Sequence, residues 1–281
     1  MTRSTMNHSS ASLLITLILS MGLSAGASAD DHSLVCEKRW NEMLAGYAVA
    51  YQPQDAPHLL GEWKRLEDQC KGTGVYEVHL ATLYIGIHDW KSAQNVIESL
   101  RSPPDAYAGL WKFLKLTAQL GIMAGEKPIP MAKVIALRPQ YLAALDETRD
   151  WYIAWEQVAN YMLLIQDYPS AIAHAEKSIE MRGDQWEPHR TLTIAYAHVG
   201  EYQRALDSAG KVRDLRPGGQ IVDRDYTHSI AKSYAGIGQI KVAEKILAAM
   251  IRADPSEKDD PGFADVINFI TMQLNAGNVK D

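Results

Sequence analysis

The stretch that decides the fold runs from residue 195 to residue 206 and reads Ala195-Tyr196-Ala197-His198-Val199-Gly200-Glu201-Tyr202-Gln203-Arg204-Ala205-Leu206. A turn followed by an alanine recurs at the same spacing in three other places. These are Asp167-Tyr168-Pro169-Ser170-Ala171-Ile172, Tyr234-Ala235-Gly236-Ile237-Gly238-Gln239-Ile240-Lys241-Val242-Ala243 and Tyr84-Ile85-Gly86-Ile87-His88-Asp89-Trp90-Lys91-Ser92-Ala93. Because ordinary amphipathic helices share a period but no common register, this shared register predicts an internal repeat.

The aligned copies carry particular residue types at fixed positions. With Trp186 as position 1, the copies begin at Gly74, Tyr152, Trp186 and Arg224. Position 8 holds Ala81, Ala159, Thr193 and Ala231, position 11 holds Tyr84, Met162, Tyr196 and Tyr234, and position 20 holds Ala93, Ala171, Ala205 and Ala243. Small side chains at positions 8 and 20 let two helix backbones approach closely in a packed interior. The pattern predicts a helical hairpin in each copy.

This register resembles the tetratricopeptide repeat family, whose unit of 34 residues is a pair of antiparallel helices. The resemblance implies an all-α fold, a right-handed superhelical solenoid of antiparallel helix hairpins. A closing proline stands at position 32 in two of the copies, as Pro217 and Pro255. Proline there cannot continue the second helix of a hairpin.

Extending the register gives the domain organisation. We expect a signal peptide (1–29), an N-terminal helical hairpin that is a degenerate repeat (30–73), two repeats of which the second is degenerate (74–141), an insertion (142–151), three repeats (152–257), and a C-terminal capping helix with a tail (258–281). The degenerate copy has Lys115 and Lys127 at its two small positions and Pro139 at position 32, which predicts a short second helix. The acidic stretch from Glu257 to Asp260 is expected to be a solvated loop.

The N-terminus reads as an export signal. Arg3 is the only charged residue before Asp30, a short apolar run surrounds Leu17, and Ala27-Ser28-Ala29 is a small-x-small cleavage site. The apolar run is too short to span a bilayer, although an uncleaved anchor is the alternative. We therefore expect an exported, periplasmic protein without an integral membrane segment after cleavage.

The two cysteines, Cys36 and Cys70, are expected to form a disulfide. An exported chain with an even cysteine count favours a bridge over two buried thiols. If Cys36 begins one helix of the first hairpin and Cys70 ends the other, the two sulfurs lie at about the same height on facing surfaces.

The sequence offers no chemistry for catalysis. It lacks H-E-x-x-H, paired Cys/His ligands, a carboxylate-rich calcium loop, a G-x-S-x-G elbow and a complete phosphate loop. We therefore expect no catalytic residues, no metal, no cofactor and no enzymatic activity. A net charge of −6 with scattered Lys and Arg also argues against binding to nucleic acid.

The resemblance places a binding groove on the first helix of each hairpin, chiefly at positions 2, 5, 9, 12 and 13. Carried over by position, the polar candidates for contact with a partner are Glu156, Asn160, Arg190, His198, His228 and Lys232. Some family members clamp a C-terminal carboxylate with Lys and Asn. Here Asn160 matches that set, but Glu156 and Leu164 stand where cations would be needed, which argues against such a clamp.

The expected function is a non-enzymatic scaffold or adaptor that holds a protein or peptide partner of the cell envelope in its concave groove. The alternative is a periplasmic component of a transport system that binds a small ligand. Its support is the aromatic group Trp151, Tyr152 and Trp155 beside the predicted insertion.

Overall fold

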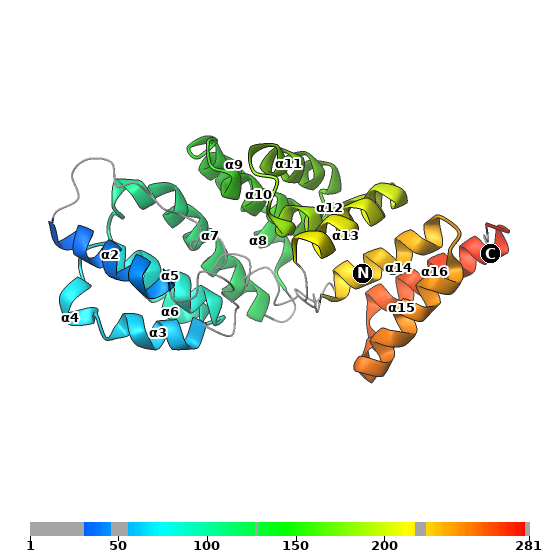
Figure 1. Ribbon diagram of the computed structural model, residues 1–281, viewed down its shortest axis with the longest axis horizontal. Helices are drawn as coiled ribbons and strands as arrows, with labels where there is room; N and C mark the ends of the chain where they lie inside the picture. Colours follow the sequence, from blue (N-terminus) through cyan, green and yellow to red (C-terminus); the bar gives the residue numbers. More distant parts are fainter. Residues whose placement is uncertain (1–30, 46–55, 127–128, 217–222, 279–281) are drawn as a thin grey trace. The chain divides into compact units, whose positions relative to one another are not determined.

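The computed structural model describes residues 31–45, 56–126, 129–216 and 223–278, and every regular element among them is a helix. The all-helical prediction is therefore confirmed for this part of the chain. The predicted signal peptide lies outside the described residues, as do Lys127 and the proposed closing residue Pro217. The chain divides into two units, one ending at Asp150 and the other beginning at Trp151. Within each unit, helices that follow one another in sequence pack side by side (Figure 1).

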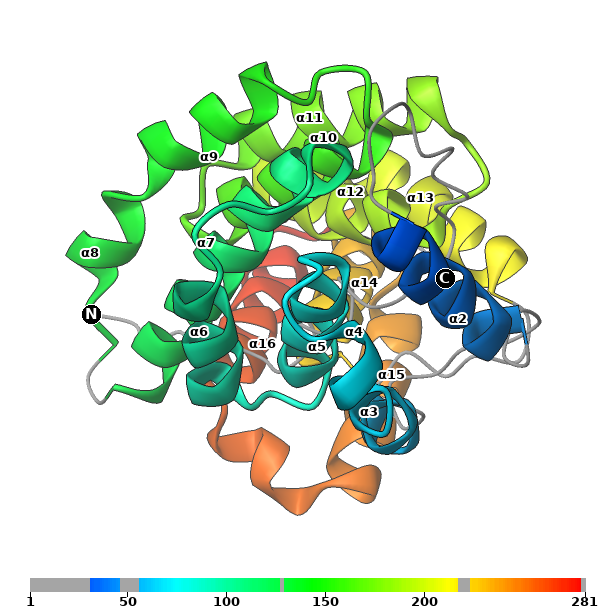
Figure 2. The ribbon, with the colours of Figure 1, turned by 90° about the vertical axis from the view of Figure 1, so that its left-hand side faces the viewer.

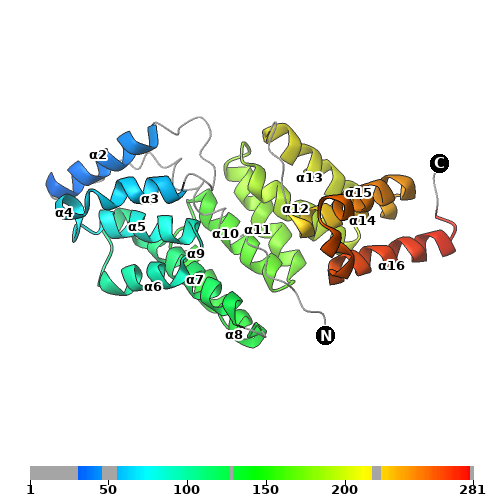
Figure 3. The same cartoon turned by 90° about the horizontal axis from the view of Figure 1, so that it is seen from below.

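The N-terminal unit is built from eight α-helices and one 3-10 turn among its described residues. They are α2 (Asp31–Ala45), α3 (Ala56–Lys64), α4 (Glu67–Cys70), α5 (Val75–Gly86), α6 (Trp90–Ser99), η2 (Asp105–Tyr107), α7 (Ala108–Gly125), α8 (Met131–Ile135) and α9 (Arg138–Asp146). Helix α5 is the centre of the unit, since α2, α3, α4, α6 and α7 all pack against it. Figure 3 shows α2, α3 and α5 lying side by side.

A disulfide between Cys36 and Cys70 joins α2 to α4, with the two Cα atoms 5.7 Å apart. This confirms the predicted bridge. Both cysteines are buried, as are Trp40 on α2 and Trp63 on α3. The bridge therefore lies in the packed interior of the unit.

Aromatic rings gather around a buried histidine in the same unit. His79 stacks on Trp40 at a centroid distance of 3.9 Å and lies edge-on to Trp63 and Tyr107. The Tyr107 hydroxyl donates a hydrogen bond to Glu37 and lies 3.3 Å from His79 Nε2. Burial lowers the pKa of His79, so the ring is neutral at pH 7. These contacts attach α2 and η2 to α5.

The degenerate copy differs from the expectation after α7. In place of one short second helix, two helical segments follow, α8 and α9 (Figure 2). Pro139, expected to close a helix, lies in the first turn of α9. A proline is tolerated there because the first N–H groups of a helix have no partner inside it. The expected insertion starts inside α9, because residues 142–146 belong to that helix.

The C-terminal unit contains seven α-helices and one 3-10 helix among its described residues. They are α10 (Tyr152–Leu164), α11 (Tyr168–Met181), α12 (Trp186–Val199), α13 (Tyr202–Leu215), α14 (Arg224–Gly236), α15 (Ile240–Ala253), η3 (Pro255–Asp259) and α16 (Pro261–Asn275). Three copies of the sequence repeat give the three helix pairs α10–α11, α12–α13 and α14–α15. The fourth copy, in the N-terminal unit, gives α5–α6.

The small residues at positions 8 and 20 of the repeat lie in the packed interior, as the sequence predicts. All eight side chains at positions 8 and 20 are completely buried. At each of these positions a larger side chain would have to push two packed backbones apart. The aromatic position 11 is more variable, with Met162 and Tyr196 buried but Tyr84 and Tyr234 only half-buried.

The four helix pairs also turn in the same way. Position 15 has a positive φ in every copy, at His88 (61°), Gln166 (62°), Gly200 (85°) and Gly238 (87°). The next backbone N–H, at position 16, donates in each copy to the carbonyl oxygen of position 11 at 2.8–2.9 Å. A left-handed residue followed by this long-range bond is a common helix ending. The repeat therefore extends to backbone geometry, including two copies that lack glycine at the turn.

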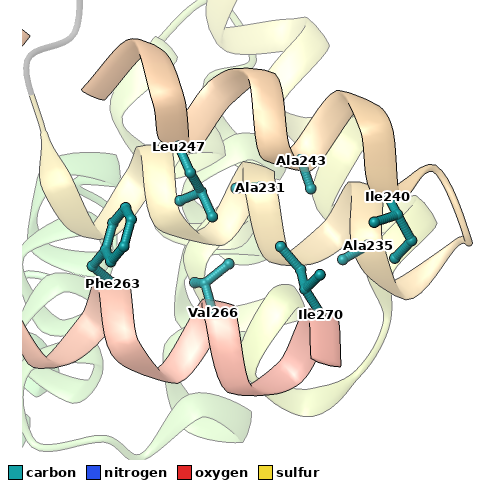
Figure 4. Close-up of a cluster of buried hydrophobic side chains, with 8 residues drawn as sticks. All are labelled: Ala231, Ala235, Ile240, Ala243, Leu247, Phe263, Val266 and Ile270. Atoms are coloured by element: carbon teal, nitrogen blue, oxygen red, sulfur yellow. The ribbon is translucent and has the colours of Figure 1, made fainter. Parts of the chain in front are cut away.

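Helix α16 covers the last helix pair. Phe263, Val266 and Ile270 pack against Ala231, Ala235, Ile240, Ala243 and Leu247 of α14 and α15 (Figure 4). These three side chains are buried, whereas Ile267 and Leu274 on the same helix are exposed. No helix in the described ranges is long and apolar enough to cross a membrane.

Candidate functional site

The first helices of the three C-terminal pairs, α10, α12 and α14, bring together an unusual set of buried polar groups. Helix α12 packs against both α10 and α14. We call the resulting surface the polar face and define it by Glu156, Asn160, Glu187, Arg190 and Asp223. Four of these side chains are at most 6% exposed, and Asn160 is half-buried. Buried charged groups are rare in proteins unless they are paired or functional.

Arg190 and Asp223 form a buried ion pair across the polar face. Arg190, on α12, donates through Nε and Nη2 to Asp223 Oδ2. The other oxygen of Asp223 accepts from the backbone N–H of Tyr226 at 3.3 Å and so caps α14. The pair therefore fixes the start of α14 against α12. Arg190, predicted as a groove residue, is committed to a structural contact.

Glu156 and Glu187 are the two carboxyl groups of the polar face that lack a pairing cation. Glu156, on α10, is 1% exposed and Glu187, on α12, is 2% exposed. Burial raises the pKa of Glu156 well above its ordinary value, and the negative charge of Glu187 raises it further. Burial also raises the pKa of Glu187, to about 7, although backbone N–H groups and the charges of Arg216 and Arg190 oppose the change. Both carboxyl groups are therefore costly to ionise here.

Hydrogen-bonding capacity remains unused at this point. Within the described part of the chain, no donor reaches Glu156 Oε1 or Glu187 Oε2. Asn160 accepts a hydrogen bond from the Thr191 hydroxyl at 2.6 Å, whereas its Nδ2 group has no acceptor among the same residues. The polar face thus presents two acceptors and one donor that the described residues leave unsatisfied.

His198 and Lys232 lie close enough to each other to interact electrostatically. Partial desolvation of the ring lowers the pKa of His198, and the charge of Lys232 lowers it further. His198 is exposed and stacks on Tyr168 of α11 with a centroid distance of 4.3 Å. The half-buried Lys232 places its Nζ 5.7 Å from the centre of the Phe269 ring on α16. Burial lowers the pKa of Lys232. These two residues have packing partners but keep contact with solvent.

His228 belongs to a different group, which fixes the C-terminal helix. Its Nε2 lies 3.7 Å from Glu257 and its Nδ1 lies 3.9 Å from Asp260. Arg224 pairs with the same two acids and with Asp254. The expectation of a solvated acidic loop is wrong for Glu257, which is 5% exposed because Arg224 and His228 cover it. Sequence alone could not show that the start of α14 supplies these partners.

The aromatic residues behind the small-ligand alternative make contacts within their own helix pair. The guanidinium group of Arg182 lies over the Tyr152 ring, 5.0 Å from the ring centroid, and Arg182 Nη1 donates a hydrogen bond of 3.0 Å to the Tyr152 hydroxyl. Trp155 lies 5.6 Å from the His174 ring on α11. These contacts hold α11 against α10. Across the described residues, no group of three or more His, Cys, Asp or Glu side chains is arranged to hold a metal ion.

The position-based prediction found part of the polar face. Glu156, Asn160 and Arg190 come together there, while His198, Lys232 and His228 do not. Asp223 was missed because it precedes position 1 of its copy and so lies outside the repeat pattern. Glu187 stands at position 2, which the resemblance assigns to the groove, but nothing in the sequence set it apart from exposed glutamates.

No protein-family model matches the chain, and no curated protein shows significant similarity to it. The evidence for a function therefore comes from the repeated helix pairs and from the buried polar groups of the polar face.

Proposed function

We propose that the protein is a tetratricopeptide-type scaffold of the bacterial cell envelope that binds a protein or peptide partner along α10, α12 and α14. In this proposal the helix pairs stack into a right-handed solenoid, and the first helix of each pair lines its concave surface. The partner lies across several repeats.

The recurring geometry of the helix pairs supports the repeat assignment. The same two small residues are buried in all four copies, and the same left-handed turn joins the two helices of each. Helices held in this way form a stiff surface, so little conformational entropy is lost when a partner binds.

One observation carries the binding function, namely the unsatisfied polar groups of the polar face. Glu156 Oε1, Glu187 Oε2 and Asn160 Nδ2 lack hydrogen-bond partners within the described residues. A buried polar group without a partner destabilises a fold by about 1–3 kcal/mol. In a native fold such groups call for a partner, which a bound ligand or an ordered water molecule can supply. A bound partner would supply the missing donors and acceptor.

The disulfide supports the proposed compartment. Disulfides such as Cys36–Cys70 persist in oxidising surroundings, which include the bacterial periplasm. Together with the N-terminal signal pattern, the bridge favours an exported protein. The small-ligand alternative has less support, because Tyr152 and Trp155 are engaged by α11.

Site-specific photocrosslinking in intact cells tests the proposal. A photoreactive residue replaces Asn160 or His198, and a third variant carries it at Glu244, an exposed position on α15. We expect the first two variants to capture the same envelope protein and the Glu244 variant not to capture it. Equal capture from all three positions, or capture from Glu244 alone, would place the working surface elsewhere.

A further inference from the structure

At its α10–α12 end the polar face buries more acidic than basic side chains. Of its one cation and three acids, Arg190 is already paired with Asp223. Arg216, whose charge opposes the rise in the pKa of Glu187, lies over the Trp186 ring at 4.5 Å. Glu156 and Glu187 are therefore left without a dedicated cationic partner, although both are almost fully buried.

The free oxygens of this pair point to the chemistry of a ligand. Glu156 Oε1 and Glu187 Oε2 lack donors within the described residues, and ionised carboxylates can only accept hydrogen bonds. A ligand that satisfies both must bring several N–H donors to one place, and a positive charge removes the repulsion between the two acids. An ammonium or guanidinium group meets both requirements.

The burial of the two carboxyl groups indicates which kind of cationic side chain could reach them. At 1% and 2% exposure, the side chains of Glu156 and Glu187 are out of reach of a peptide backbone at the surface. Lysine and arginine carry their charge at the end of a long aliphatic stem that tolerates burial. The half-buried Asn160 lies one helical turn from Glu156, and its Nδ2 group, buried like the two carboxyl oxygens, also lacks a partner within the described residues.

We propose that Glu156 and Glu187 together receive the side chain of a lysine or arginine from an extended segment of the partner protein. This inference rests on the proposed function of the polar face and adds the chemical specificity of that face. It predicts a preference for basic peptides, opposite to the carboxylate clamp of some members of the resembled family.

Peptide binding with matched neutral analogues tests this inference. The probe is a library of 12-residue peptides with blocked ends, each made in two forms that carry lysine or acetyl-lysine at one central position. The proteins are the wild type, Glu156→Gln/Glu187→Gln, the single variant Glu187→Gln and the control Glu244→Gln. Circular dichroism confirms that each variant is folded before its affinities are compared.

We expect the wild type and Glu244→Gln to bind the best lysine peptides about 30-fold more tightly than their acetylated forms, which is the usual order for loss of one partner of a buried charge pair. The double variant should bind both forms equally, and Glu187→Gln should show a reduced preference. The wild-type preference should also grow as pH rises from 6 to 8, because ionised carboxylates bind the cation.

Two results would overturn the inference, and they differ in what they say about the proposed function. If peptides bind but the lysine preference is absent, or survives unchanged in the double variant, the cation site is wrong while the binding face stands. If no peptide binds, the cation site is wrong, and the photocrosslinking experiment alone decides whether the face binds a folded partner.

Discussion

Replacing Glu187 by glutamine should remove a pH-dependent weakness from the fold. Burial raises the pKa of this carboxyl group from its ordinary 4.5 to about 7. A group whose pKa is higher in the folded state contributes stability that is fully present below about pH 4.5 and is lost as pH rises through about 7. The neutral amide of glutamine has no such dependence and nearly the same shape.

The size of the effect follows from the pKa difference. The folded and unfolded values differ by about 2.5 pH units, and each unit corresponds to about 1.36 kcal/mol. Between pH 4.5 and pH 8 the free energy of unfolding of the wild type should therefore fall, relative to Glu187→Gln, by about 3 kcal/mol. Any constant cost of burying an amide cancels in this comparison.

Urea unfolding followed by circular dichroism at several pH values measures the difference, with Glu244→Gln as the matched control. Subtracting the two profiles removes the titration of groups that Glu187 does not influence, such as His79 and His228, whereas Glu156 contributes to the difference because the charge of Glu187 raises its pKa. Parallel profiles for wild type and Glu187→Gln would refute the reasoning, because they would mean that Glu187 titrates as a solvated carboxyl group. A difference that appears equally in Glu244→Gln would have the same meaning.

Three further predictions concern the disulfide, the repeat and export. Replacing Cys36 by serine should destabilise the first helices by about 4 kcal/mol in the chain-entropy model, since the bridge closes a 34-residue separation. Hydrogen exchange should become faster at residues 31–75 and stay unchanged from Tyr152 onward. Faster exchange along the whole chain would contradict a local role of the bridge. Replacing the fully buried Ala205 by leucine should lower the free energy of unfolding, measured with urea, by about 1–3 kcal/mol. The control Ala173→Leu, on the exposed side of α11, should change the same quantity by less than about 0.5 kcal/mol. Protein isolated from the envelope should begin at Asp30 by N-terminal sequencing, and a chain that still begins at Met1 in the cytoplasm would contradict the compartment.

The sequence predicts the helix pairs well because their determinants are local. Small residues such as Ala159 and Ala205 must lie where two helices cross, so a shared register places them without knowledge of the tertiary structure. The disulfide could be predicted from the cysteine count and the expected first hairpin, although the expected second helix is divided into α3 and α4 and Cys36 lies inside α2, which begins at Asp31.

The polar contacts could not be predicted because the repeat positions that indicate packing do not indicate which polar residues pair. Arg190 pairs with Asp223, which belongs to the connection before the next copy. Arg224 at the start of α14 covers Glu257, which follows the end of α15. Position within a repeat indicates which face a residue occupies, but burial depends on neighbours that the repeat does not specify.

Hydrogen exchange of the purified complex with the photocaptured partner tests the central claim most directly. We predict that partner binding slows exchange in segments of α10, α12 and α14 and leaves α11, α13 and α15 unchanged, with the slowing reduced in Glu156→Gln/Glu187→Gln. Slowed exchange confined to α11, α13 and α15, or to the helices before Asp150, would contradict the claim that the polar face is the binding surface.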